Sequence, residues 1–146
     1  KIKIRRMNFE RKCSVMGRKM KFGCLVKKGV AEVRERDLPE VGPYDVLLHM
    51  KVCNICTTDY GQWLGLRGHE AAGIVEQVGE KVTDLKVGDM VATGYEGCGH
   101  CPACREGHID QCEEIRNDTE DGYKWGFFGF SNYCVKNSSG VYKVAT

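Results

Sequence analysis

The sequence has little proline and no long apolar run. Only 3 of its 146 residues are proline whereas 18 are glycine, which is typical of a chain with many turns. No stretch approaches the length of a membrane-spanning helix, and the chain does not open on a signal-peptide segment. We therefore expect a soluble cytoplasmic protein with no membrane partner, long enough for one domain with a real core.

Acidic residues are nearly absent from the first 22 positions. This stretch holds nine Lys or Arg against one acid, Glu10, although the net charge of the whole chain is only +2. A basic arm can bind nucleic acid, but no aromatic interleaving or nucleic-acid-binding motif accompanies this one. We therefore predict residues 1–20 to be a flexible N-terminal arm. The alternative is a standalone zinc-binding structural or adaptor module that contacts nucleic acid through the arm.

Cysteine is abundant, and four of the nine cysteines are clustered. The spacings between the four are two, two and seven residues, with few apolar residues between them, at Cys98, Cys101, Cys104 and Cys112. Such a segment cannot bury enough surface to order itself. Tetrahedral Zn²⁺ on four thiolates would supply the missing folding free energy, so we predict a structural zinc here.

Two other interpretations of this cluster stay open. The first three cysteines also suit an iron–sulfur cluster, but the bacterial pattern needs three residues before a fourth Cys followed by Pro, and Cys112 is followed by Glu113. The other interpretation is a disulfide framework, against which the odd cysteine count and the missing signal argue. Since four thiolates already close a tetrahedral shell, we expect His100 and His108 to face solvent.

Short strands with glycine turns are predicted through most of the chain. The predicted strands cover residues 22–26, 30–34, 45–53, 73–79, 90–93, 131–135 and 141–144. In the strand 45–53 the inward residues are expected to be Val46, Leu48, Met50 and Val52, and in the turn 81–89 they are expected to be Leu85 and Val87. We predict a mainly β fold, a partly open β-barrel with short helices and an excursion at the cysteines, rather than a βαβ sheet.

A second set of metal-binding residue types surrounds Cys56 and His69. A thiolate, an imidazole and the nearby carboxylates of Asp59 and Glu70 are the parts of an open zinc site. Thr58 adds a hydroxyl that can pass a proton. A lone histidine beside a strand is more often structural, and this alternative is open as well.

Cys53 offers a competing interpretation, because it forms a Cys-x2-Cys pair with Cys56. A thioredoxin-like pair needs a βαβ context, which this pattern of short strands lacks. Cys53 also ends an alternating strand, where a small buried residue fits better than a ligand.

Five pieces of the chain together resemble the N-terminal GroES-like domain of the zinc-dependent medium-chain alcohol dehydrogenases, a family that includes polyol and threonine dehydrogenases. The pieces are residues 52–59, 68–73 and 78–89, the four-cysteine segment, and the closing residues 130–144. The resemblance covers about residues 21–146. We therefore expect these residues to form one GroES-like domain that includes a structural zinc lobe at residues 95–114.

The resemblance also implies the roles of particular residues. Catalytic zinc would be held by Cys56 and His69, with Glu70 and Asp59 as supporting or exchangeable carboxylates and Thr58 as the proton-relay hydroxyl. Structural zinc would be held by Cys98, Cys101, Cys104 and Cys112. The reaction implied is zinc-assisted hydride transfer between a small-molecule alcohol or polyol and NAD(P).

The chain departs from the family pattern in two places. The family continues into a Rossmann domain, but no Gly-x-Gly-x-x-Gly occurs here, and Gly97-Cys-Gly99 has Pro102 where the third glycine should be. We therefore expect this chain alone to be inactive, with the Rossmann domain as its partner and homo-oligomers through an exposed docking face as an open alternative. Residues 60–67 are also shorter than the loop usual in the family, which leaves the substrate undetermined.

Overall fold

The computed structural model describes residues 17–27, 29–57, 59, 65–66, 68–113, 119–120, 123–124 and 129–144. The basic arm up to residue 16 and Thr58 lie outside this part of the chain, as does most of residues 114–128. The predictions made for them stay predictions.

The described residues form mainly short strands, which confirms the predicted fold class. The strands are β1 Lys19–Lys27, β2 Val30–Asp37, β3 Asp45–Cys53, β4 Gly65–Leu66, β5 Ala71–Val78, β6 Met90–Thr93, β7 Thr119–Glu120, β8 Tyr123–Lys124, β9 Tyr133–Asn137 and β10 Val141–Lys143. The short helices are α2 Pro102–Arg105, η2 Ile109–Gln111 and η3 Ser138–Gly140. All seven predicted strands are present. Those at 45–53 and 90–93 have the predicted bounds, and the other five have shifted ends.

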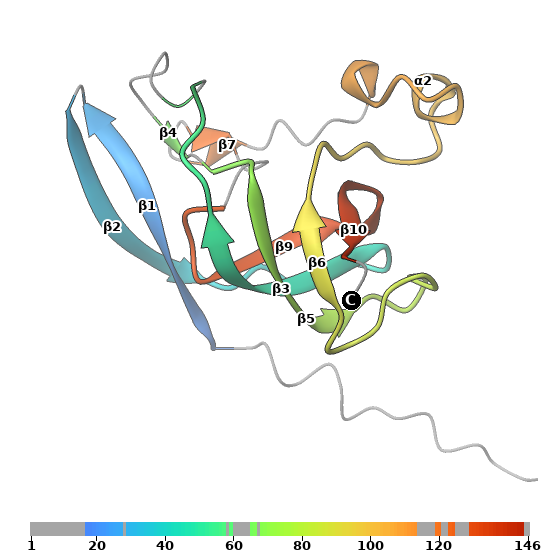
Figure 1. Cartoon of the computed structure of the whole chain (residues 1–146), viewed down its shortest axis with the longest axis horizontal. Coiled ribbons are helices and arrows are strands. Elements are labelled where there is room, and N and C mark those ends of the chain that lie inside the picture. The colour runs from blue at the N-terminus through green and yellow to red at the C-terminus, as the bar shows by residue number, and fades with distance from the viewer. Residues whose placement is uncertain are drawn as a thin grey trace, which may run out of the picture.

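The strands form a curled, partly open barrel (Figure 1). One antiparallel sheet has the order β10-β6-β5-β3-β9, and another has the order β2-β1-β4. Residues 130–132 join the two, because Phe22 bridges to Ser131 and Gly23 N donates to Phe130 O at 2.7 Å. The β1–β2 hairpin lies on one side of the molecule, and the segment carrying α2 projects on the opposite side (Figure 1).

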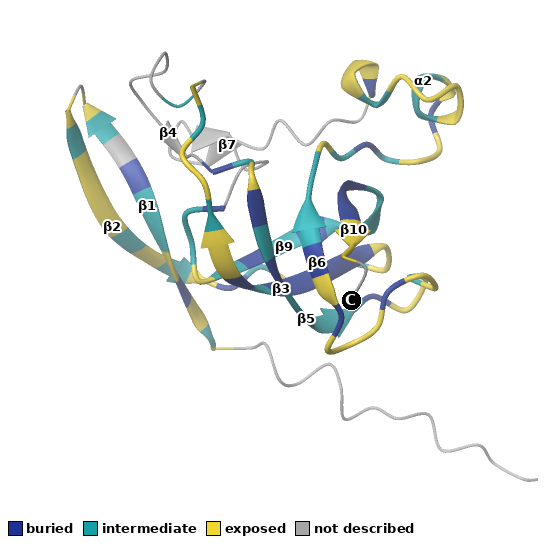
Figure 2. Cartoon of the chain, in the orientation of Figure 1, coloured by how far each residue is buried: buried dark blue, intermediate teal, exposed yellow. Residues whose placement is uncertain are grey.

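The core lies between the curled sheets. The residues of β3 that face it differ from the prediction at two positions. Val46, Leu48 and Met50 are buried as expected, but Leu47 is also buried, at 1% exposure. Val52 is 57% exposed, and it follows an irregularity in the β3–β5 register between Met50 and Val52, which interrupts the strict alternation of faces. Figure 2 shows this change from buried to exposed along β3.

The turn between β5 and β6 shows the same contrast. Leu85 is buried at 6% exposure, whereas Val87 is 57% exposed, so the prediction for Val87 is wrong. Apolar identity alone does not place a turn residue inward. Within the described residues, no helix is long and apolar enough to span a membrane.

Candidate metal centres

The four clustered cysteines come together at the tip of the projecting segment. Their sulfur atoms all lie within 4.8 Å of one another, at Cys98, Cys101, Cys104 and Cys112. The chain reaches this position from the end of β6, and α2 starts directly after Cys101, whose side chain caps the helix by accepting from Cys104 N. The predicted lobe is therefore formed by local turns around the thiols.

Backbone amides point at these sulfur atoms. Cys98 N donates to Cys112 Sγ at 3.2 Å, and Cys101 N donates to Cys98 Sγ at 3.2 Å. The backbone N–H groups of Cys104 and Glu113 lower the pKa of the Cys101 thiol to about 6. Because metals bind the thiolate, such donors favour the form that ligates.

The sulfur geometry fits a tetrahedral zinc ion. With Zn–S bonds of about 2.3 Å, sulfur atoms in a tetrahedral site lie about 3.8 Å apart. The Cys98 and Cys104 sulfur atoms lie 4.0 Å apart. All eight cysteines of the described part are free thiols, so no disulfide framework is formed there. His100 and His108 are exposed, and neither belongs to the sulfur cluster.

The base of the lobe is attached to the barrel by polar contacts. Ser139 Oγ donates to Gly97 O at 2.6 Å and accepts from Gly97 N at 3.2 Å. The Glu96 carboxylate accepts from Asn137 N at 3.0 Å and pairs with Lys136 Nζ at 3.3 Å. The lobe is therefore held at residues 96–97 by β9 and η3, next to its first cysteine.

Gly97→Ala is expected to weaken metal binding by the lobe. A Cβ atom at Gly97 would lie 2.5 Å from Cys104 Sγ and 3.1 Å from Ile109 Cγ2, so a ligand must shift. Overpacking of this kind costs about 1–3 kcal/mol, which corresponds to about a 5- to 150-fold weaker metal affinity if the lobe bears it all. Competition titration of Cd²⁺ against a chelator measures this change.

Gly23→Ala is the matched control, because its Cβ would meet Phe130 atoms at 3.5 Å or more, an ordinary contact. Equal metal affinity of the Gly97→Ala variant and the parent chain would contradict the close packing of Gly97 against Cys104.

A second group of metal-binding atoms lies at the same end of the five-stranded sheet, where β3 and β6 end and β5 begins. Atoms of Cys56, His69 and Glu70 lie within 4.8 Å of one another. Cys56 follows the end of β3, and the other two residues directly precede β5, so antiparallel pairing of β3 with β5 brings the two loops together. The His69 side chain is 29% exposed and the Glu70 side chain 50% exposed, so the group opens to solvent.

Asp59 is not part of that group but holds its cysteine loop in shape. Its carboxylate accepts from Cys56 N at 2.7 Å, and its own N–H donates to Cys56 O at 3.0 Å. Asn54 N also donates to Glu70 O at 2.9 Å, which ties the cysteine loop to the loop of the other two residues. Thr58 lies outside the described residues, so its predicted role is untested.

Cys53 lies beside this site without joining its group of ligand atoms. Burial, followed by the charges of Asp59 and Glu70, raises the pKa of the Cys53 thiol to about 11. A thiol that stays protonated is a poor metal ligand. All strand pairs in the described residues are antiparallel, so the βαβ unit required by a thioredoxin-like pair is not found there.

Two residues that hold the second site were not predicted from the sequence. Thr93 Oγ1 donates to His69 O at 3.3 Å and to Ala71 O at 3.2 Å, and Gly129 N donates to Gly68 O at 2.7 Å. Gly68 has a φ of +94°, and a Cβ there would lie 2.5 Å from Phe130 N. This close approach explains a glycine immediately before the histidine.

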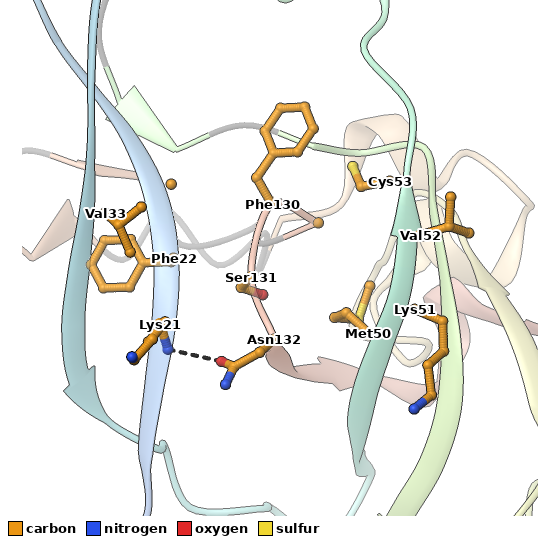
Figure 3. Close-up of a pocket in the computed structure, with 12 residues that line it drawn as sticks. Lys21, Phe22, Val33, Met50, Lys51, Val52, Cys53, Phe130, Ser131 and Asn132 are labelled. Atoms are coloured by element: carbon orange, nitrogen blue, oxygen red, sulfur yellow. Dashed lines mark hydrogen bonds between the residues drawn. The ribbon is translucent and has the colours of Figure 1, made fainter.

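An open groove of about 540 Å³ lies between β1 and β3, with residues 129–132 along its floor (Figure 3). Its apolar lining comes mainly from Phe22, Val33, Met50, Val52 and Phe130. Cys53 also lines the groove, and, in addition to burial, the charges of the nearby Asp59 and Glu70 carboxylates raise the pKa of its thiol.

Residues 42–146 match the alcohol dehydrogenase GroES-like domain family. The chain is 42% identical over 108 residues to an uncharacterized zinc-type alcohol dehydrogenase-like protein of Escherichia coli (strain K12), covering 66% of this chain and 30% of the relative. It is 35% identical over 127 residues to an alcohol dehydrogenase of Geobacillus stearothermophilus, covering 77% and 36%.

A solved structure described as CAD from Helicobacter pylori complexed with NADP(H) has the same fold, with a TM-score of 0.73 and 26% identity. The similarity covers 86% of this chain and 41% of that chain. The chain therefore spans about one third of the length of these two curated relatives and less than half of the structural one.

Proposed function

The chain belongs to the alcohol dehydrogenase GroES-like domain family, and from this premise we propose that it is the zinc-binding catalytic part of an NAD(P)-dependent alcohol or polyol dehydrogenase. The observation that carries the proposal is the convergence of Cys56, His69 and Glu70 in an open site, apart from a closed four-cysteine lobe. A closed four-thiolate shell is the form of a structural zinc site, whereas an open shell leaves a position for substrate.

The donor set of the open site fits a catalytic zinc, for which Cys56, His69 and Glu70 would be the ligands. Bound there, zinc supplies a Lewis acid that polarises a carbonyl or stabilises an alkoxide while hydride passes to or from a nicotinamide. Glu70 is the half-exposed member and is therefore the ligand that substrate or water most readily displaces.

The surrounding residues would prepare this site. The Asp59 carboxylate accepts from Cys56 N and so fixes the backbone at Cys56. The Cys56 side chain is thereby held close to His69. We propose Thr58 as the hydroxyl that removes the alcohol proton as the alkoxide forms. The nicotinamide-binding partner would be a Rossmann domain, and the substrate a small alcohol or polyol.

Metal content tests this proposal directly. Zinc per chain is measured by elemental analysis, first as purified and then after titration of the 146-residue chain with zinc. Two bound ions are expected at saturation, and His69→Asn is expected to reduce the number to one, because the open site loses its imidazole while the sulfur cluster is intact. His108→Asn is the matched control, since this exposed ring lies outside both groups.

One ion at saturation in the parent chain, or loss of the lobe ion in His69→Asn, would contradict the open site. Turnover is tested separately. We expect little oxidation of alcohols by this chain alone and activity when it is joined to a nucleotide-binding domain. Robust turnover by the 146-residue chain would overturn the proposal that it is only the zinc-binding part.

A further inference from the structure

The loop at residues 68–70 supplies two of the three ligand residues of the open site. Each of its three carbonyl oxygens accepts a hydrogen bond from a different segment of the chain. The pairs are Gly129 N to Gly68 O at 2.7 Å, Thr93 Oγ1 to His69 O at 3.3 Å and Asn54 N to Glu70 O at 2.9 Å. Two of these donors are backbone amides. Thr93 is the side-chain donor of the three, so a substitution can remove its bond alone.

Thr93 is the last residue of β6 and lies where the pairing of β5 with β6 ends. The pairing of β5 with β6 runs from Ile74 opposite Met90 to Ala72 opposite Ala92. At the next position Ala71 lies beside Thr93, and the carbonyl of Ala71 accepts from Thr93 Oγ1 at 3.2 Å. The side-chain hydroxyl therefore holds the backbone of residues 69–71 at the end of this ladder.

A single hydroxyl proton is shared between two carbonyls that flank Glu70. These are His69 O at 3.3 Å and Ala71 O at 3.2 Å, so the hydroxyl spans the residue that carries the carboxylate ligand. The bond to His69 O holds the peptide plane that joins His69 to Glu70, and the bond to Ala71 O holds the plane that joins Ala71 to Ala72. Asn54 N holds the plane between these two through Glu70 O. These bonds thereby set the direction in which the His69 ring and the Glu70 carboxylate leave the backbone.

We propose that Thr93 is a positioning residue for the open metal site, acting through its hydroxyl on the backbone of His69 and Glu70. This inference rests on the proposed function, because the site it serves is the proposed catalytic zinc site. Thr93 is not one of the grouped ligand residues. Residues that orient metal ligands from behind typically change metal affinity by about 10- to 100-fold when mutated.

The test uses Cd²⁺ as the probe on the full 146-residue chain. The ¹¹³Cd NMR shift depends on the number of thiolate ligands, so the four-cysteine lobe and the single-cysteine open site give separate signals. Chelator competition then measures the dissociation constant of each site. We expect Thr93→Val to raise the dissociation constant of the open site by about 10-fold or more, with the lobe unchanged. Thr93→Ser is expected to restore binding, because it keeps the hydroxyl.

Thr83→Val is the matched control, since Thr83 is an exposed threonine in the turn between β5 and β6. Thr93→Ala serves as a second hydroxyl-free variant should Thr93→Val fold poorly. Circular dichroism and the lobe signal report on folding. Parent-like Cd²⁺ binding at the open site in hydroxyl-free variants, failure of Thr93→Ser to restore binding, or equal weakening of both sites would each overturn the positioning role.

The same experiment separates this inference from the proposed function. If the parent chain gives only the lobe signal at saturating Cd²⁺, the open metal site itself is wrong and Thr93 has nothing to position. If the parent chain gives both signals and Thr93→Val gives both with unchanged affinities, the proposed function stands and only the role of Thr93 is wrong.

Discussion

Cys104→Ala is expected to abolish tight metal binding by the lobe and to release residues 97–112 from a fixed conformation, while the barrel stays folded. The lobe has little apolar packing of its own, because α2 and η2 contain no buried residue. Metal binding contributes on the order of 10 kcal/mol to the folding of small zinc domains, so the loss of one of four thiolates removes most of what orders this lobe.

The measurement combines Cd²⁺ titration with amide hydrogen exchange. Protection of residues 97–112 is expected to fall close to that of an unstructured segment, whereas protection in β3 and β5 is expected to persist. Cys134→Ala is the matched control. It removes a buried thiol of β9 that belongs to neither metal group, so its effect is expected on barrel stability and not on lobe metal binding.

Unchanged lobe affinity in Cys104→Ala would mean that three thiolates suffice and that the site is not a closed tetrahedral shell. Loss of protection throughout the barrel would mean that lobe and barrel unfold as one unit. Either result would contradict a lobe that is ordered locally by its metal.

The lobe and the fold class were predictable because their signals are local. Four cysteines within 15 positions favour a shared metal centre, and alternating apolar residues between glycine turns are typical of short strands. The approach of Cys56 to His69 was predicted through the family resemblance. The structure explains it by the pairing of β3 with β5, which places the ends of both loops side by side.

Thr93 was not predictable, because its two hydrogen bonds join residues 22 and 24 positions apart. A threonine in a strand is ordinary, and only the point where the β5–β6 ladder ends gives this one a role. The prediction for Val52 was wrong for a related reason. Strand alternation assumes a regular strand, and the sequence does not show the irregularity in the β3–β5 pairing between Met50 and Val52.

Lys136 is the clearest case in which the structure departs from what residue type suggests. Its side chain is 6% exposed, although lysine is almost never buried without a partner. The partner is Glu96, whose side chain is 17% exposed and which precedes the cysteine lobe. The same carboxylate oxygen accepts from Asn137 N, so one partly buried acid holds the lobe base to β9.

Lys136→Met is therefore expected to lower the free energy of unfolding by about 3 kcal/mol, because removing one partner of a buried ion pair leaves the other charge desolvated and unpaired. Urea denaturation of the metal-loaded chain measures the loss. Lys21→Met is the matched control. Lys21 pairs with Glu35 at 3.4 Å, but both side chains are at least half exposed, so its loss is expected to cost less than about 1 kcal/mol.

The double variant Lys136→Met with Glu96→Gln identifies the cause. Glutamine keeps an oxygen that can accept from Asn137 N but carries no charge, so most of the lost stability is expected to return. If the double variant is as unstable as Lys136→Met, the lysine contributes through packing of its aliphatic stem rather than through its charge. A cost for Lys136→Met no larger than that for Lys21→Met would mean that water reaches Glu96, and the ion pair would then not fix the lobe to the barrel.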